Sequence, residues 1–217
     1  SRVPGTTRDA IDTPVERDGE KYIFVDTAGI RRKSKVSENV EYYSVLRSLK
    51  ALDDADLALL LLEAPEGVTE QDQRIAGYIL ESGKALIMAL HKWDLIQRFD
   101  QKGPERDVIN NTREALKFAS FAPLVSTSVH AARQIKKLFT LFPGIYANYS
   151  RRIPTSLLNE LLGEAQSMNP LPTIKGRKGR IYYWTQSSTK PPTFVLFVND
   201  PKLIHFSYLR YLENRLR

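Results

Sequence analysis

Tyr22-Ile23-Phe24-Val25-Asp26-Thr27-Ala28-Gly29 is an apolar run that ends at an aspartate and then turns at a glycine. A short run of β-branched and aromatic residues before a turn is typical of a buried strand. In open α/β sheets, ligands bind beyond the carboxyl ends of the strands, which is where Asp26 is expected to lie. A carboxylate followed by a turn of small residues suits a hydrated Mg²⁺ beside a phosphate group. The stretch therefore predicts a nucleotide-related site at a sheet edge.

The residues on either side predict a mostly parallel α/β sheet. Residues 10–29 form two strands around the turn Arg17-Asp18-Gly19-Glu20, because Asp-Gly between apolar runs is a hairpin signal. Beyond them, helical spacing begins at Ser37 and continues to Leu52. Strands are expected at 55–64 and 84–90, with helices at 72–82 and 133–149. Strands that alternate with helices favour parallel pairing with right-handed crossovers.

The last third predicts a separate small α+β domain. Arg151-Arg152-Ile153-Pro154-Thr155 marks a boundary, so we assign residues 1–150 and 151–217 to different domains. Thr155 or Ser156 is expected to cap a helix that buries one apolar stripe, formed by Leu157, Leu158, Leu161 and Leu162. Strands at 179–186 and 193–198 and a helix from about Phe206 follow. Strand alternation places Tyr182 and Trp184 on one face and Tyr183 on the other. Whether all three aromatic side chains pack internally is left open.

Three motifs carry a resemblance to a known group of proteins. Thr6-Thr7, Asp26-Thr27-Ala28-Gly29 and Lys92-x-Asp94 resemble switch I, switch II and the guanine-reading motif of translation-factor-related GTPases. The run Gly5 to Asp12, Glu41-Tyr42-Tyr43-Ser44-Val45-Leu46-Arg47 and the segment Lys190 to Asp200 are similar to the Der (EngA) family of bacterial ribosome-assembly GTPases. The resemblance covers nearly the whole chain. It implies a P-loop-NTPase-like (Ras-like) domain, the second GTPase domain of that family from switch I onward, followed by a KH-like domain.

The resemblance also implies the roles of individual residues. Thr7, or Thr6, would coordinate Mg²⁺ and cover the γ-phosphate of GTP, Asp26 would hold Mg²⁺ through water, and Gly29 would sense the γ-phosphate through its backbone N–H. Ile30 stands where many GTPases have a water-orienting glutamine, so a bound K⁺ is expected to assist slow hydrolysis. Contacts to GTP or GDP are expected from two groups of residues: Asp26, Thr27, Ala28, Gly29 and Ile30 in switch II, and His91, Lys92, Trp93, Asp94, Ser128 and Val129 around the base.

Two departures from the family pattern fall in the base pocket. His91 replaces an asparagine, and a neutral imidazole offers one donor and one acceptor rather than an amide's pair. Val129 replaces an alanine, and two glycines are missing from the segment Ser128 to Gln134. Asp94 still retains the acceptors that reject adenine. Either the changes are neutral in a serviceable fold, or they weaken guanine binding; the residues alone favour neither.

The phosphate loop G-x-x-x-x-G-K-S/T occurs nowhere in the 217 residues. GTPases of this superfamily place it before switch I, so we expect an N-terminally truncated domain that is inactive by itself. The upstream GTPase domain of the family is then an expected partner in a longer protein.

Charge is divided unevenly along the chain. Residues 1–150 hold 21 basic and 21 acidic residues, whereas residues 151–217 hold 11 and 4, which is the whole net charge of +7. Such asymmetry favours a polyanion-binding module. The family resemblance implies that the polyanion is ribosomal RNA of the large subunit. Within this module, Lys175, Arg177, Lys178 and Arg180 form a basic cluster, although Gly176-Arg177-Lys178-Gly179 precedes a strand and so fits poorly the G-x-x-G loop of KH domains. Arg31-Arg32-Lys33-Ser34-Lys35 is either a solvated loop or a second RNA contact.

The composition contains no cysteine and no apolar run long enough for a membrane span, which fits a cytoplasmic protein. We also expect a monomer that does not contact membranes. Two functions remain from the sequence. The first is a GTP-hydrolysing ribosome-assembly switch. The second is a nucleotide-free module that only presents a basic surface to RNA.

Overall fold

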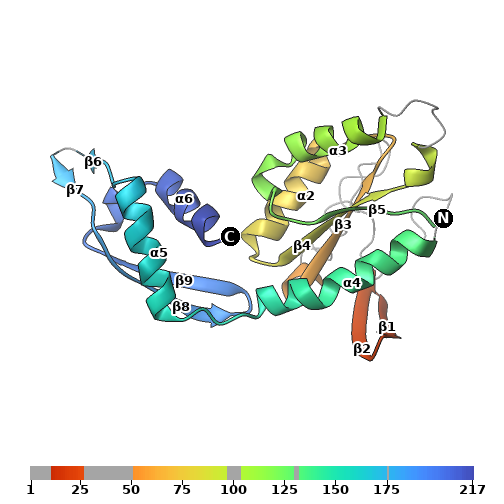
Figure 1. Cartoon of the computed structure of the whole chain (residues 1–217), viewed down its shortest axis with the longest axis horizontal. Coiled ribbons are helices and arrows are strands. Elements are labelled where there is room, and N and C mark those ends of the chain that lie inside the picture. The colour runs from red at the N-terminus through yellow and green to blue at the C-terminus, as the bar shows by residue number, and fades with distance from the viewer. Residues whose placement is uncertain (1–10, 27–50, 97–103, 130–131, 175) are drawn as a thin grey trace, which may run out of the picture. The chain divides into compact units, whose positions relative to one another are not determined.

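The computed structural model describes residues 11–26, 51–96, 104–129, 132–174 and 176–217. The chain divides into two compact units, Ser1–Tyr146 and Ala147–Arg217, which we describe separately. Figure 1 labels the elements of both units. Of the segment 37–52 with helical spacing, residues 37–50 lie outside the described residues. Residues 51–54 are helical.

The predicted hairpin is the first described element of the first unit. Strands β1 (Ile11–Arg17) and β2 (Glu20–Asp26) pair antiparallel, with Arg17 opposite Glu20. The two loop residues, Asp18 and Gly19, both have positive φ angles, 53° and 82°. This combination matches a type I′ turn, whose twist suits a two-residue hairpin. The hairpin prediction is therefore confirmed.

A parallel sheet forms the centre of this unit. Its strands are β3 (Leu57–Glu63), β4 (Ala85–His91) and β5 (Leu124–Ser126), in the order β3-β4-β5. The helices are α2 (Glu70–Glu81), α3 (Pro104–Ala115) and α4 (Ala132–Tyr149). Two short 3-10 helices are also present: η1 (Trp93–Leu95) follows β4, and η2 (Lys117–Ala119) follows α3. The predicted strands at 55–64 and 84–90 and the helices at 72–82 and 133–149 are confirmed with slightly different bounds. Helix α3 and strand β5 were not expected.

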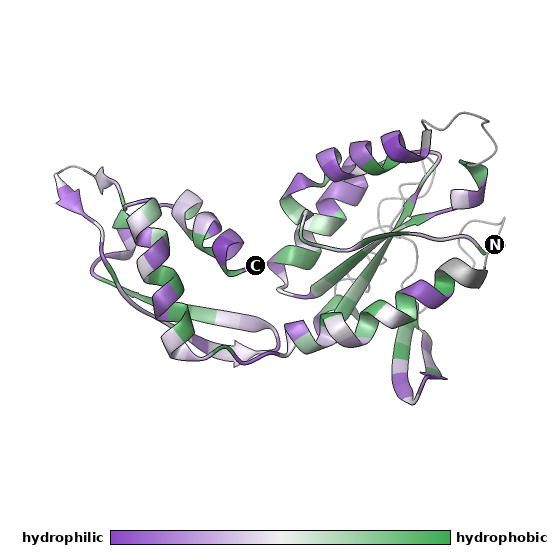
Figure 2. Cartoon of the chain, viewed as in Figure 1, coloured by the Kyte–Doolittle hydropathy of each residue, from purple (hydrophilic) through white to green (hydrophobic). Residues whose placement is uncertain are grey.

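Strand β4 is buried on both faces because helices cover both sides of the sheet. Leu86, Met88 and Leu90 pack with α2 residues such as Ala76 and Ile79. Ile87 and Ala89 pack on the opposite side with residues of α4. This explains the continuous apolar sequence of β4, which Figure 2 shows in green, instead of an alternating one.

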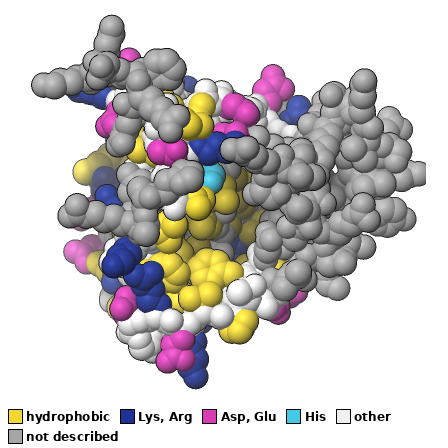
Figure 3. All heavy atoms as spheres, turned by 90° about the vertical axis from the view of Figure 1, so that its right-hand side faces the viewer, with side chains coloured by type: hydrophobic (Ala, Val, Ile, Leu, Met, Phe, Trp, Pro, Cys, Tyr) yellow, Lys and Arg dark blue, Asp and Glu magenta, His cyan; other side chains and the backbone are white. Residues whose placement is uncertain are grey.

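The α4 side of the sheet also receives the hairpin. Tyr22 and Phe24 of β2 meet Phe139 and Phe142 of α4 with ring centroids 5.4–6.1 Å apart. The guanidinium of Arg17 lies 4.6 Å from the centre of the Phe139 ring. Figure 3 shows one face on which hydrophobic side chains gather in the middle, bordered by basic side chains and by residues that are not described. The aromatic cluster thus links β2 to the unit by packing, since the described strands β2 and β3 share no hydrogen-bonded ladder.

Helix α2 begins at a capping box. The backbone N–H of Asp72 donates to Oγ1 of Thr69 (3.2 Å), and the N–H of Thr69 donates to Oδ2 of Asp72 (2.9 Å). These two bonds satisfy groups that a helix end would otherwise leave unpaired. The helix therefore starts two residues earlier than predicted.

The second unit contains α5 (Thr155–Met168), four strands and α6 (Phe206–Leu216). The strands form two antiparallel pairs, β6 (Thr173–Ile174) with β7 (Arg177–Lys178) and β8 (Ile181–Thr189) with β9 (Pro192–Val198); the 3-10 helix η3 (Pro201–Leu203) precedes α6. Its core lies between α5, α6 and one face of β8, and its buried residues are Leu158, Leu162, Ala165, Leu171, Ile181, Trp184, Tyr208 and Leu212. The predicted helix, strand pair and final helix are confirmed.

Two local predictions in this unit are wrong. The cap of α5 is neither Thr155 nor Ser156, because the helix already includes both; Pro154 occupies the cap position and provides no side-chain hydrogen bond. Leu157 is 54% exposed, so the apolar stripe consists of Leu158, Leu162 and the half-buried Leu161. The Pro154 carbonyl accepts the first hydrogen bond of the helix, from the Leu158 N–H at 3.2 Å, so α5 begins there without a side-chain cap.

The predicted alternation of the three aromatic residues in β8 is also wrong. Trp184 is 3% exposed, whereas Tyr182 and Tyr183 are 63% and 43% exposed. Ile181 pairs with Val198 and Tyr183 pairs with the next residue, Phe197, so Tyr182 is an extra residue in the ladder. This β-bulge breaks the period of two and turns both tyrosines outward.

Among the described residues, no helix has the length and apolarity that crossing a membrane requires.

Candidate functional site: the carboxyl edge of the parallel sheet

Three strands of the first unit end side by side. Glu63 of β3 is in register with His91 of β4, and Leu90 of β4 is in register with Ser126 of β5. Thr127 then ties the two loops together: its N–H donates to the Leu90 carbonyl (2.7 Å), and its carbonyl accepts from the Trp93 N–H (3.1 Å). The segments after β4 and β5 are thus held against each other by the backbone.

Asp94 receives a hydrogen bond from the other loop. The Ser128 hydroxyl donates to Oδ1 of Asp94 over 2.5 Å. Ser128 is 1% exposed, and Asp94 is half-buried. A charge-assisted bond of this length fixes the orientation of the carboxylate. A fixed carboxylate at a sheet edge can accept two parallel N–H donors from a planar ligand.

Lys92 occupies a strained backbone position between β4 and η1. Its φ and ψ angles are 59° and 34°, in the left-handed region that non-glycine residues seldom adopt. Its ammonium contacts Oε2 of Glu63 at 2.8 Å, and the lysine side chain remains 45% exposed. Strain of this kind is frequent at functional sites. Glu63 was not among the predicted residues, although it ends an apolar strand just as Asp26 does.

His91 contacts the β5 side of the edge. Its Nδ1 lies 3.4 Å from Oγ1 of Thr127, and its carbonyl accepts from the N–H of Ala64 (3.0 Å). The backbone bond anchors the end of β4 to the segment after β3. Thr127, like Glu63, was missed by the sequence analysis because its role depends on the pairing of β4 with β5.

The remaining residues of the predicted base pocket differ in exposure. Trp93 is 4% exposed and packs in the core cluster on the α2 side, so its side chain stabilises the loop. Val129 is 70% exposed. The structure therefore brings His91, Lys92, Asp94 and Ser128 together at one edge, with Val129 following directly. Their contacts to a nucleotide stay a prediction.

The predicted phosphate and magnesium residues are described only in part. Asp26 is the last residue of β2, as expected, and only its backbone is described. Thr6, Thr7, Thr27, Ala28, Gly29 and Ile30 lie outside the described residues, as do Arg31 to Lys35. Within the described ranges, no group of three or more His, Asp or Glu side chains could hold a metal ion. Magnesium coordination by Thr7 and Asp26 thus stays a prediction.

The basic cluster of the second unit lies in a short hairpin. Gly176 to Gly179 spans the end of the β6–β7 turn and strand β7, where a KH loop would join two helices. This confirms that the segment is not a helix-joining G-x-x-G loop. Lys175 lies outside the described residues.

Comparisons with known families match both units. The family described as "50S ribosome-binding GTPase" matches residues 1–92. The family described as "KH-domain-like of EngA bacterial GTPase enzymes, C-terminal" matches residues 152–217.

Curated relatives match over the full length of the chain. GTPase Der of Caldanaerobacter subterraneus subsp. tengcongensis is 51% identical over 217 residues, which are 100% of this chain and 49% of the relative. GTPase Der of Heliobacterium modesticaldum and that of Acetivibrio thermocellus are each 48% identical with the same coverage. The chain therefore spans about half the length of the curated relatives that it matches.

Solved structures show the same fold. A crystal structure of Era in complex with MgGDPNP and nucleotides 1506–1542 of 16S ribosomal RNA has a TM-score of 0.54 and 21% identity, over 100% of this chain and 77% of that one. A probable GTP-binding protein engB has a TM-score of 0.50 and 17% identity, over 67% of this chain and 86% of that one. At these identities the likeness concerns the fold alone. Because the relatives near 50% identity and both family matches agree, the chain belongs to the Der (EngA) family of bacterial GTPases.

Proposed function

We propose that residues 1–150 bind GTP and GDP and that residues 151–217 bind ribosomal RNA, as parts of a GTP-hydrolysing factor in the assembly of the large ribosomal subunit. The observation that supports guanine recognition best is the bond from Ser128 to Asp94 at the carboxyl edge of the sheet. Guanine presents its ring N–H and exocyclic amine side by side. A carboxylate held in one orientation accepts from both, whereas adenine offers no such pair of donors.

The wider edge fits this role. Lys92 lies two residues before Asp94 in the chain and its side chain is about half exposed, so we expect it to contact the same planar ligand. Asp26 and Thr7 would hold Mg²⁺, which neutralises charge on the phosphates when bound. Gly29 would contact the γ-phosphate. Ile30 cannot orient the attacking water, so hydrolysis without further help would be slow. A K⁺ ion would supply the positive charge that other GTPases draw from an arginine.

Nucleotide titration tests this proposal. The comparison needs the 217-residue chain and an extended chain in which a phosphate loop precedes Ser1. We expect the extended chain to bind GDP and GTP with Mg²⁺, to bind ATP far more weakly, and to hydrolyse GTP faster in K⁺ than in Na⁺. The 217 residues alone should release no phosphate above background, because they lack the lysine and amides that stabilise the transition state. Equal affinity of the extended chain for ATP and GTP would contradict guanine recognition by Asp94.

A second function applies to the 217-residue chain by itself. It would be a nucleotide-free module that binds RNA, and the observation in its favour is the net charge of +7 confined to residues 151–217. Ribosomal RNA binding that is unchanged by GTP or GDP would support this alternative. We place the protein in the bacterial cytoplasm as a monomer, joined in a longer chain to a further GTPase domain and bound to the large subunit.

A further inference from the structure

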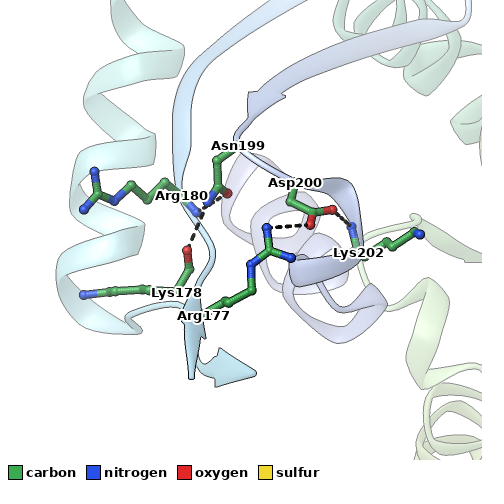
Figure 4. Close-up of polar contacts among 6 residues, drawn as sticks. All are labelled: Arg177, Lys178, Arg180, Asn199, Asp200 and Lys202. Carbon is green, nitrogen blue, oxygen red and sulfur yellow. Dashed lines mark hydrogen bonds and ion pairs between the residues drawn. The ribbon is translucent and has the colours of Figure 1, made fainter. Parts of the chain in front are cut away.

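The three described cations of the basic cluster have different surroundings. Arg177 contacts Oδ2 of Asp200 through its guanidinium at 3.4 Å, and Asp200 also accepts from the N–H of Lys202 at 3.0 Å. Figure 4 shows the Lys178 and Arg180 side chains extending the other way, toward α5. Arg177 is thus partly neutralised within the unit, whereas Lys178 and Arg180 form no ion pair with a described acidic residue.

Lys178 and Arg180 converge on a pocket. The pocket has a volume of about 220 Å³ and is lined by Gln166, Pro170, Leu171, Lys178, Gly179 and Arg180. Gln166 is held in place because its Nε2 donates to the Ile181 carbonyl (3.3 Å). None of the described lining residues is acidic, so Lys178 and Arg180 give the pocket two positive charges.

The backbone that carries the two cations is fixed. Asn199 accepts from the Arg180 N–H at its Oδ1 (2.8 Å) and donates from Nδ2 to the Lys178 carbonyl (3.1 Å). These bonds clamp both residues from the β9 side, as Figure 4 shows. A Cβ on Gly179 would lie 3.1 Å from the Leu203 carbonyl oxygen, so the chain between the two cations packs closely against η3. Such fixed spacing lowers the entropy cost of binding one anion with both side chains.

One structural role for the two cations is already filled by other groups. Positive side chains often stabilise the carbonyl groups at the end of a helix, and α5 ends beside this pocket. However, Tyr211 donates to the Ala165 carbonyl (3.0 Å) and Tyr208 donates to the Asn169 carbonyl (2.9 Å). The two tyrosine hydroxyls thereby satisfy one carbonyl of the last turn and the carbonyl of the C-cap residue, so Lys178 and Arg180 are not needed for those two.

An exposed ring lies close by along the chain. Tyr182 is two residues beyond Arg180, so their Cα atoms are about 7 Å apart or less. The β-bulge leaves Tyr182 63% exposed. Single-stranded nucleic acid is typically bound by cationic side chains that contact its backbone together with exposed aromatic rings that stack on its bases.

We propose that Lys178 and Arg180 bind a backbone phosphate of single-stranded RNA in this pocket and that Tyr182 stacks on an adjacent base. The proposal rests on the proposed RNA-binding function of residues 151–217 and assigns that function to one site. It differs from a G-x-x-G loop, in which backbone groups between two helices clamp the nucleotides. It also excludes Arg177, although Arg177 belongs to the same basic segment.

Binding of a fluorescent single-stranded RNA oligonucleotide to the 217-residue chain tests the site. Lys178→Ala and Arg180→Ala should each lower the affinity and each reduce the slope of log affinity against log salt by about 0.7. Arg177→Ala is the matched control, because it removes the same charge from the same hairpin. The RNA affinity and the salt slope of Arg177→Ala should change clearly less.

Equal losses for all three variants would overturn the proposal, since they would reveal only a diffuse positive field. Unchanged melting temperatures would show that the variants are folded.

Two further measurements identify the ligand: RNA binding by Tyr182 variants, and binding of inorganic polyphosphate. Tyr182→Ala should weaken RNA binding about tenfold and Tyr182→Leu similarly, while Tyr182→Phe retains binding, because stacking needs a ring. Inorganic polyphosphate should bind the native chain and the Tyr182→Ala variant equally. If Tyr182→Ala leaves RNA affinity unchanged, the site is for phosphate groups in general, and the assignment to RNA is wrong. GDP binding by the extended chain is measured in parallel. If the extended chain with no substitution fails to bind GDP, the proposal of guanine recognition is contradicted. The proposal of an RNA site at Lys178 and Arg180 is not affected by that result.

Discussion

Ser128 and Asp94 come from different loops of the first unit, and the serine hydroxyl donates to the aspartate carboxylate over 2.5 Å. The bond exists because β4 and β5 are parallel neighbours whose loops are joined through Thr127. A residue that recognises a base must be held before the base arrives, since otherwise binding has to order it. Ser128 holds the Asp94 carboxylate in one orientation, and in the proposed guanine site it would act as a positioning residue for Asp94.

Replacing Ser128 by alanine should weaken GDP binding by the extended chain. The loss of a charge-assisted hydrogen bond removes about 1.5 kcal/mol, or roughly tenfold in affinity. Titration calorimetry with GDP measures the effect, and Ser120→Ala is the control because the Ser120 side chain is exposed in a different loop. If Ser128→Ala binds GDP like the native sequence, Asp94 does not depend on Ser128 for its orientation.

Replacing His91 by asparagine should have the opposite effect and strengthen GDP binding by the extended chain. An amide restores a donor and an acceptor that can bridge the base and the phosphate loop, which is worth about 0.5–1.5 kcal/mol. The extended chain with His91→Asn should therefore bind GDP about two- to tenfold more tightly. His91→Ala removes the ring without adding the amide and should not gain affinity. An equal gain in both variants would mean that the imidazole merely obstructs the site.

Two glycines of the second unit should respond oppositely to alanine. Gly163 is exposed inside α5, where a Cβ meets no atom within 4 Å, so Gly163→Ala should raise the free energy of unfolding by about 0.5–1 kcal/mol. At Gly179 the new Cβ would approach the Leu203 carbonyl oxygen to 3.1 Å, and this neighbour is backbone. Gly179→Ala should lower the free energy of unfolding by about 1–3 kcal/mol. Urea unfolding of the two variants beside the native chain measures both values.

Tyr208 should make the second unit sensitive to alkaline pH. Burial raises the pKa of the Tyr208 hydroxyl, and the neighbouring Tyr211 adds to the increase. The folded state therefore keeps this proton to higher pH than the unfolded state does. The stabilisation is fully present below the ordinary tyrosine pKa of about 10, and it is lost progressively as pH rises above that value.

The variant Tyr208→Phe tests this dependence. At neutral pH it should cost about 0.5–1.5 kcal/mol, because the hydrogen bond to the Asn169 carbonyl is lost. Above pH 10 its free energy of unfolding should fall less steeply than that of the native chain. Tyr182→Phe removes an exposed hydroxyl and serves as the control. Parallel pH profiles for the native chain and Tyr208→Phe would show that the phenol is not responsible.

Features governed by neighbouring residues could be predicted from the sequence. Asp18-Gly19 identified the hairpin because both residues tolerate positive φ angles, and the apolar run of β4 identified a strand. Helix α3 was missed because its sequence is mostly polar, and β5 was missed because three residues give too little periodicity. The bulge at Tyr182 depends on the partner strand, so the alternation of β8 alone could not reveal it.

The candidate site also contains residues that a local motif identifies and contacts that depend on other strands. His91, Lys92 and Asp94 lie within four consecutive residues, so a motif was enough to find them. Ser128 was also found, but its bond to Asp94 was not evident because it comes from the loop after a different strand. Glu63 was missed because it ends β3, a strand that no motif connected to the site. The proximity of these residues follows from the order β3-β4-β5, which the sequence suggested only as parallel pairing without strand positions.

The separation of the two sheets in the first unit affects how the isolated chain will behave at high concentration. Among the described residues, β2 hydrogen-bonds only to β1 and β3 only to β4, although Tyr22 of β2 and Leu57 of β3 pack against the same cluster. A strand edge of this kind is a template on which other chains can add strands. We therefore expect slow self-association that increases with protein concentration and persists in high salt, because peptide groups rather than charges drive it.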